Sequence, residues 1–87
     1  MKKTFNLIII TPESEVFKGD VVSLNCETTE GRMGILPDHC AVIAGLVPTI
    51  TMFEEVDGKK HEIKTSNGVL KVRKNNVSIL CDTVEWS

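Results

Sequence analysis

Three turn signals divide the second half of this chain into segments that suit strands better than helices. They are Asp57-Gly58, Asn67-Gly68 and Asn75-Asn76, dipeptides that favour tight turns. Their spacing of about ten residues is typical of an all-β sandwich or barrel. No stretch of the chain sustains the apolar periodicity of an amphipathic helix. The sequence therefore predicts an all-β fold.

Alternation of apolar and polar residues predicts where the strands lie. We expect strands at residues 5–10, 15–18, 22–27, 49–53, 61–66, 69–74 and 77–81, with a turn at Gly19-Asp20. The segment 61–66 is mostly polar and resembles an edge strand, whereas residues 82–87 carry no strand signal. At this length, a two-sheet antiparallel β-sandwich of about eight to ten short strands fits better than a closed barrel.

Length and composition bound the class of protein. With 87 residues the chain makes a single domain, 1–87, and folding hides about 60–65% of the surface of the unfolded chain. Its 41% hydrophobic and 25% charged residues argue against disorder. The net charge is −2 and the basic residues are scattered, so no nucleic acid partner is expected. No apolar run approaches the roughly 20 residues of a membrane helix, so direct membrane insertion is not expected.

The cysteines indicate packing rather than chemistry. Cys26, Cys40 and Cys81 are odd in number, far apart and without a Cys-x-x-Cys spacing, which favours reduced thiols. Cys26 and Cys81 occupy positions where an alternating strand requires an apolar side chain. We therefore expect no metal site.

The alternating pattern is interrupted between Glu30 and Pro48. Gly31 and Gly34 flank Arg32 and Met33, Pro37 restricts the backbone, and an almost wholly apolar run follows from Cys40 to Val47. This run is either a strand buried on both faces or a strand with one face left for a partner. A domain this small has little interior to cover both faces, which favours the second interpretation.

Catalytic motifs are absent from the sequence. There is no nucleophile elbow, phosphate-binding loop or framed carboxylate pair, and the best candidate cluster is Asp38-His39-Cys40. Neighbours in an extended segment point to opposite faces, so His39 is poorly placed to activate Cys40. His39 is either a turn residue bonded to a backbone carbonyl or an interface contact. No catalytic residue and no cofactor are expected.

One segment of the chain resembles a known pattern. It runs Gly31-Arg32-Met33-Gly34-Ile35-Leu36-Pro37-Asp38-His39 and is followed by an apolar strand and Pro48. It is similar to Gly-x-Leu-Gly-Ile-x-Pro-x-His-Ala-Pro in the sandwich domain of the epsilon subunit of F-type ATP synthases. The resemblance extends along the chain through Pro12-Glu13, Val16-Phe17-Lys18-Gly19, a hairpin over 67–72 and the closing segment 77–83.

The resemblance implies a non-catalytic subunit of the central stalk, on the cytoplasmic face of the bacterial cell membrane and peripheral to it. Such a subunit binds the gamma subunit and the membrane rotor ring of c subunits within the assembled complex, and couples ion-driven rotation to ATP synthesis. By the family pattern, Glu30, Gly31 and Arg32 would contact the ring. The residues that would contact gamma are His39, Cys40, Ala41, Val42 and Ala44.

The sequence departs from the family pattern in places. Cys40-Ala41 stand where Ala-Pro is frequent, Asn67 replaces a usual Gly, and Arg32 carries positive charge where the family is often acidic. The family usually continues into a C-terminal helical hairpin that restrains ATP hydrolysis and in some members binds ATP. The sequence ends at Ser87, about where the sandwich does, so the hairpin is expected to be absent and neither activity is carried over.

Two other classes compete with this interpretation. A small carrier domain of the lipoyl or biotinyl type presents a modified Lys at a hairpin tip, and Asp57-Gly58-Lys59-Lys60 supplies such a tip without the usual Met-Lys-Met or Asp-Lys-Ala context. A metal or thiol-redox module would use the three cysteines and two histidines.

Overall fold

All regular secondary structure in the computed structural model, which describes residues 3–86, is β-strand. This range holds β1 (Phe5–Ile10), β2 (Glu15–Thr28), β3 (Gly31–Ile35), β4 (Val42–Leu46), β5 (Thr49–Glu55), β6 (Lys60–Thr65), β7 (Gly68–Arg73), β8 (Asn76–Cys81) and β9 (Val84–Trp86). The all-β prediction is confirmed. Residues 3–86 include no helix long and apolar enough to cross a membrane.

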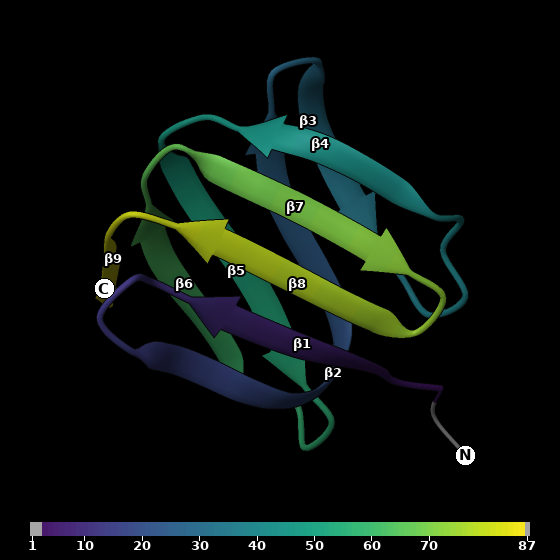
Figure 1. Cartoon of the computed structure of the whole chain (residues 1–87). Coiled ribbons are helices and arrows are strands. Elements are labelled where there is room, and N and C mark those ends of the chain that lie inside the picture. The colour runs from purple at the N-terminus through teal and green to yellow at the C-terminus, as the bar shows by residue number, and fades with distance from the viewer. Residues whose placement is uncertain (1–2, 87) are drawn as a thin grey trace.

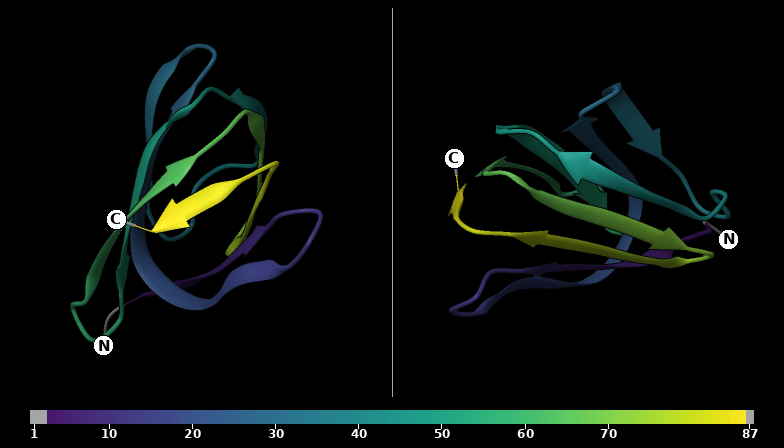
Figure 2. Two further views of the ribbon diagram at one scale, coloured as in Figure 1. Left: turned by 90° about the vertical axis from the view of Figure 1, so that its left-hand side faces the viewer. Right: turned by 45° about the horizontal axis from the view of Figure 1, so that its top comes forward.

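The strands form two packed layers (Figure 1). The first layer holds β1, β8, β7 and β4 in that order, and the second holds β3, β2, β5, β6 and β9. Because β2 pairs with β1 through its first half and with β3 and β5 through its second half, hydrogen bonding is continuous between the layers. Figure 2 shows β2 curving from one layer into the other. The expectation of wholly antiparallel sheets is wrong at one pair, since β1 and β8 run parallel.

The predicted turn at Gly19-Asp20 is wrong. Both residues lie inside β2, where they pair with Leu7 and Asn6 of β1. The two short strands expected at 15–18 and 22–27 are therefore one strand. The partner strand β1 supplies hydrogen bonds along this segment, and that pairing outweighs the local turn preference of a Gly-Asp sequence.

A bulge in β2 also changes which side chains face the core. Val21 pairs with Glu55 and Ser23 with the next residue, Glu54, so Val22 is an extra residue on this strand. As a result Val21 is buried, while Val22, which the alternation placed inward, is half-buried. Such a bulge bends and twists a strand, which suits the place where β2 passes between the layers.

The core consists of inward side chains from both layers. The alternation of apolar and polar residues in the two segments 69–74 and 77–81 places Leu70, Val72, Val77, Ile79 and Cys81 inward, and all five are buried. In β5, Thr51 and Phe53 form the buried face while Ile50 and Met52 are exposed. The buried hydrophobic residues are Phe5, Leu7, Ile9, Val21, Leu24, Cys26, Ile35, Leu46, Phe53, Ile63, Leu70, Val72, Val77, Ile79 and Cys81. The expected packing role of Cys26 and Cys81 is therefore confirmed.

Two of the three turn signals connect paired strands. The Asp57-Gly58 turn joins β5 to β6, and the turn at Lys74 and Asn75 joins β7 to β8. The hairpin expected around Asn67-Gly68 is wrong, because β6 and β7 lie in different layers. Gly68 is required there by close packing, since a Cβ atom would lie 2.1 Å from the carbonyl oxygen of Leu80.

The polar segment expected to be an edge strand has a neighbour on each side. β6 pairs with β5, and over Ile63 to Thr65 it also pairs with β9, a strand that the sequence did not predict. Trp86 of β9 packs its ring edge-on against His61, with centroids 5.7 Å apart. This aromatic contact, together with the pairing to β6, holds the segment after β8 in place.

Candidate functional site

The hairpin of β2 and β3 carries the residues predicted to contact a rotor ring. Its tip, Thr29-Glu30, projects from the sandwich at the top of Figure 1. The Thr28 hydroxyl donates a hydrogen bond to the carbonyl of Gly31 at 2.8 Å and accepts one from the amide of Glu30 at 3.1 Å. Gly31 has φ 117°, in the left-handed region that favours glycine. The turn is therefore well defined and leaves Glu30 exposed.

Arg32 lies on the outer surface of the second layer, where it is exposed as predicted. Its Nη1 atom is 3.4 Å from the Thr49 hydroxyl oxygen, and in the β2–β3 register it is directly opposite Glu27. Burial raises the pKa of the neighbouring Cys26 thiol to about 11, and the positive charge of Arg32 opposes this rise. Glu30, Gly31 and Arg32 thus lie together, one at the tip and two in the first positions of β3.

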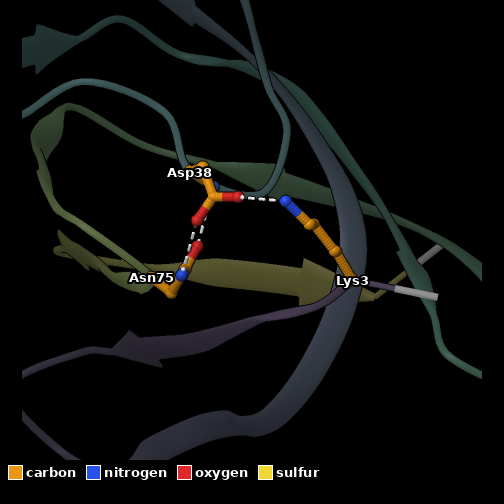
Figure 3. Close-up of polar contacts among 3 residues, drawn as sticks. All are labelled: Lys3, Asp38 and Asn75. Carbon is orange, nitrogen blue, oxygen red and sulfur yellow. Dashed lines mark hydrogen bonds and ion pairs between the residues drawn. The ribbon is translucent and has the colours of Figure 1, made fainter. Parts of the chain in front are cut away.

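At the other end of β3, the loop of residues 36–41 is fastened through Asp38 (Figure 3). The Asp38 amide donates to Oδ1 of Asn75 at 2.7 Å, and Nδ2 of Asn75 donates to Oδ1 of Asp38 at 3.0 Å. Nζ of Lys3 lies 3.1 Å from the other carboxylate oxygen. The hydrogen bond from Asn75, followed by the hydrogen bond and charge of Lys3, lowers the pKa of Asp38. The carboxylate is thus held in its charged form.

His39 bonds a backbone carbonyl, which confirms one of the two interpretations of this residue. Its Nδ1 atom is 2.8 Å from the carbonyl oxygen of Cys40, an arrangement that requires the proton on Nδ1. The Cys40 sulfur is 3.9 Å from the same nitrogen. A nitrogen that donates to a carbonyl cannot also accept the thiol proton, so this pair lacks the geometry of a nucleophile and its base. Among residues 3–86, no three His, Cys, Asp or Glu side chains gather as a metal site.

β4 is exposed along one face. Val42, Ala44 and Leu46 share the inward face, while Ile43 is 72% exposed on the outward face. The interpretation of this run as a strand buried on both sides is therefore wrong. Val42 and Ala44, two of the predicted gamma contacts, are half-buried and point inward; His39 is also half-buried, and Cys40 and Ala41 are exposed.

Ile43 was missed by the sequence reasoning, although strict alternation along β4 could have identified it. It belongs to a larger apolar surface on the first layer. Four residues lie directly opposite one another in register across neighbouring strands, in the order Gly45, Val69, Leu80 and Ile10. Val69 is 42% exposed and Leu80 47% exposed. We call Ile10, Ile43, Gly45, Val69 and Leu80 the apolar face.

The outer surface of the second layer has a different character. Most of its outward positions carry charged side chains, although Ile50 and Met52 of β5 are also exposed on it. The charged residues are Glu27, Arg32, Glu54, Lys60, Glu62, Lys64 and Glu85. Exposed apolar surface of the kind found on the first layer is typical of a protein interface, whereas a surface of mixed charge is typical of contact with water. The second layer therefore has the more charged of the two outer surfaces.

A small β-sandwich that exposes a row of apolar side chains on one layer has the character of a binding module. Residues 4–87 match the family described as ATP synthase, Delta/Epsilon chain, beta-sandwich domain. The chain belongs to this family, which confirms both the resemblance and the sandwich fold. Its relatives are named as the epsilon chain of the ATP synthase. This name agrees with the expectation that the chain is a subunit of a complex rather than an independent enzyme.

The chain is 46% identical over 86 residues to the ATP synthase epsilon chain of Clostridium novyi, covering 99% of this chain and 66% of that one. It is 41% identical over 86 residues to the same subunit of Clostridium acetobutylicum, covering 99% and 65%. The chain thus spans slightly less than two thirds of the length of these relatives. The family match favours the ATP synthase interpretation over the carrier and redox alternatives.

Two solved structures have the same fold. A chain in the mitochondrial ATP synthase of Euglena gracilis superimposes with a TM-score of 0.90 at 25% identity, covering 95% of this chain and 53% of that chain. A chain in the central stalk and c-ring structure of the Tetrahymena thermophila enzyme gives a TM-score of 0.76 at 18% identity, covering 97% and 68%. At 18% identity, the second match supports the fold alone.

Proposed function

We propose that this chain is a non-catalytic central-stalk subunit of an F-type ATP synthase. It binds the gamma subunit and the membrane rotor ring, and it couples ion-driven rotation to ATP synthesis from the cytoplasmic face of the bacterial membrane. The observation that carries this proposal is the match of residues 4–87 to this family. The exposed tip of the β2–β3 hairpin and the apolar face supply two separate surfaces on one sandwich. The ring contact is Glu30, Gly31 and Arg32.

The gamma contact in this proposal consists of the His39–Ala41 segment, β4 and the apolar face. Val42 and Ala44 support this surface from its inward side, and Ile43 is its most exposed apolar side chain. A stable complex of this kind buries about 1,000 Å² or more in total. A few well-packed residues near the centre of an interface contribute most of its binding energy.

The gamma contact is tested by titrating the chain with gamma from the same organism in a calorimeter. Ile43→Asp is expected to weaken binding at least about tenfold, because it removes the most exposed apolar side chain of the contact and puts a charge in its place. Ile50→Asp is the matched control, since Ile50 is 45% exposed on the outer surface of the other layer. Absence of binding by the wild-type chain, or equal loss in both variants, would contradict the proposed contact.

The ring contact is tested separately in the assembled complex. Glu30→Cys, made in a Cys40→Ser background that removes the exposed native thiol, is expected to form a disulfide with a cysteine placed in the polar loop of the ring. A cysteine at Asp57, in the β5–β6 turn at another part of the sandwich, serves as control. Equal cross-linking at both positions, or none at position 30, would argue against this orientation.

A further inference from the structure

Asn75 joins three segments that are far apart in the chain. Its side chain accepts from the Asp38 amide and donates to the Asp38 carboxylate, while its own carbonyl oxygen accepts from the Asn6 amide at 2.8 Å. Lys3, just before β1, reaches the second oxygen of Asp38. The loop of residues 36–41, the β7–β8 turn and the start of β1 therefore meet at one residue (Figure 3).

The loop has little else to hold it in place. Residues 36–41 take no part in strand pairing, and Leu36 is 63% exposed. Among the described residues, the side-chain hydrogen bonds of this loop to other segments are those of Asp38 with Asn75 and Lys3; the remaining ones, between His39 and Cys40, are local. Asp38 has φ 65°, a left-handed conformation that non-glycine residues adopt at a cost. Asn75 offsets that cost.

We infer that Asn75 is a positioning residue for gamma binding, an inference that rests on the proposed function. It holds the His39–Ala41 segment in a fixed position beside Ile43, at the near end of the apolar face, so that the segment and this face contact the partner as one preformed surface. The apolar face lies on the same layer as the Asn75 turn. Val69 and Leu80 pair at the far end of β7 and β8 from that turn, and Ile43 lies between this pair and the loop. A loop ordered before binding loses less conformational entropy when the complex forms.

Asn75 is suited to a positioning role because it lies outside the core. It is exposed, as are Asp38 and Lys3, and none of them contributes to the buried cluster. Loss of its side chain should therefore affect the loop more than the stability of the fold. Its hydrogen bond is also the largest influence that lowers the pKa of the Asp38 carboxyl, which offers a spectroscopic measure of the contact.

The test compares three variants with the wild-type chain. Asn75→Ala removes both side-chain hydrogen bonds to Asp38. Asn75→Asp places two carboxylates against each other, and Asp38→Asn combined with Asn75→Asp exchanges the two groups so that one amide and one carboxylate again face each other. Affinity for gamma is measured by calorimetry, thermal stability by circular dichroism, and the pKa of Asp38 by carbon NMR where that residue is retained.

Asn75→Ala and Asn75→Asp are expected to weaken gamma binding by about five- to tenfold, the effect of losing one or two hydrogen bonds. The pKa of Asp38 should rise in Asn75→Ala, and the exchanged double variant should recover most of the affinity. If Asn75 had a purely structural role, its substitution would instead lower thermal stability and affinity for gamma in parallel. The exchanged double variant would then restore both of these quantities or neither of them.

Each outcome decides between the two proposals. If the wild-type chain does not bind gamma, the proposed function is overturned, and the inference with it. If the wild-type chain binds and Asn75→Ala binds equally well, only the positioning role is overturned. If Asn75→Ala is too unstable to measure, the double variant decides, because failure to recover affinity in a folded protein overturns the positioning role.

Discussion

Asp38 and Asn75 exchange two hydrogen bonds across the 37 residues that separate them in the chain. Their contact allows a non-glycine residue to keep a left-handed backbone, with φ 65° at Asp38. Lys74, immediately before Asn75, has a similar conformation with φ 54°, but its side chain makes no hydrogen bond within the described range 3–86. The two positions share a backbone conformation and differ in what stabilises it.

Substitution by glycine should therefore stabilise the fold at position 74 but not at position 38. Lys74→Gly should stabilise the fold by about 0.5–1 kcal/mol, because glycine adopts this conformation without steric cost. Asp38→Gly relaxes the same strain but removes the contacts with Asn75 and Lys3, so it should not stabilise the fold. Urea unfolding measures both, and equal stabilisation would show that the Asp38 contacts contribute nothing.

The buried hydroxyl pair in the second layer gives a prediction about the core. Oγ1 of Thr51 lies 3.0 Å from Oγ1 of Thr65, and both side chains are buried. Thr65→Val should cost about 1–3 kcal/mol, because it leaves the fully buried Thr51 hydroxyl without its partner. Replacing both residues by Val should recover most of that loss. A double variant less stable than the single one would contradict this account.

Gly68 gives a prediction about the close approach of β7 and β8 within the first layer. Gly68→Ala should destabilise by about 2–4 kcal/mol, because the new Cβ would meet backbone atoms of β8 that cannot move independently. Gly34→Ala is the control in β3, where the nearest atom is the side-chain oxygen of Asn25 at 3.3 Å. That side chain can rotate, so the control should change thermal stability much less; similar losses would rule out the packing explanation.

The raised pKa of Cys26 predicts a loss of stability in alkali. The thiol ionises near pH 9 in the unfolded chain but only near pH 11 in the native protein, because burial opposes the charge. Between these values the unfolded chain binds fewer protons, so stability falls as pH rises, by at most about 1.4 kcal/mol per pH unit for one group. The stability that the buried, protonated Cys26 thiol contributes is fully present below pH 9 and is lost as the pH rises toward 11.

The variant Cys26→Ala should reduce that slope in urea unfolding measured from pH 8 to 11. A smaller slope is expected to remain, because burial also raises the pKa of Cys81. The chain has no tyrosine, which removes one other group that titrates in this range. An unchanged slope in the variant would assign the pH dependence to other groups.

Substitution of Arg32 tests the proposed ring contact with little effect on the stability of the fold. Arg32→Gln should change stability by less than about 0.5 kcal/mol, as is usual for an exposed site, and should alter coupling to the ring. Arg32→Glu should cost somewhat more, because Glu27 lies directly opposite in the neighbouring strand and like charges repel across strands. Coupling is measured as proton pumping driven by ATP hydrolysis in membranes, and unaltered coupling in both variants would remove Arg32 from the contact.

Local pattern was sufficient for much of the fold. The first strand, expected at 5–10, coincides with β1, and the inward residues Leu70, Val72, Val77 and Ile79 are buried as their alternation indicates. Period-two alternation and Asn or Gly turns are properties of a few neighbouring residues. They are therefore readable without knowledge of the partner strand.

Other elements depended on pairing between distant segments. Gly19-Asp20 is a turn signal by composition, yet it is held extended by β1. Asn67-Gly68 also indicates a turn, but the strands that it joins lie in separate layers. β9 has three residues and exists through its pairing with β6. A local preference is worth too little to resist several hydrogen bonds and buried side chains.

The sequence by itself determined the class of fold, the family, and the stretch from Glu30 to Pro48 in which the predicted contacts lie, because these depend on periodicity and on residues close together in the chain. Tertiary structure alone decided that Ile43 is the exposed residue of β4, that the apolar face spans four strands, and that Asn75 holds the loop of Asp38. Each of these depends on register or on contacts between distant segments, and such contacts arise when the layers pack.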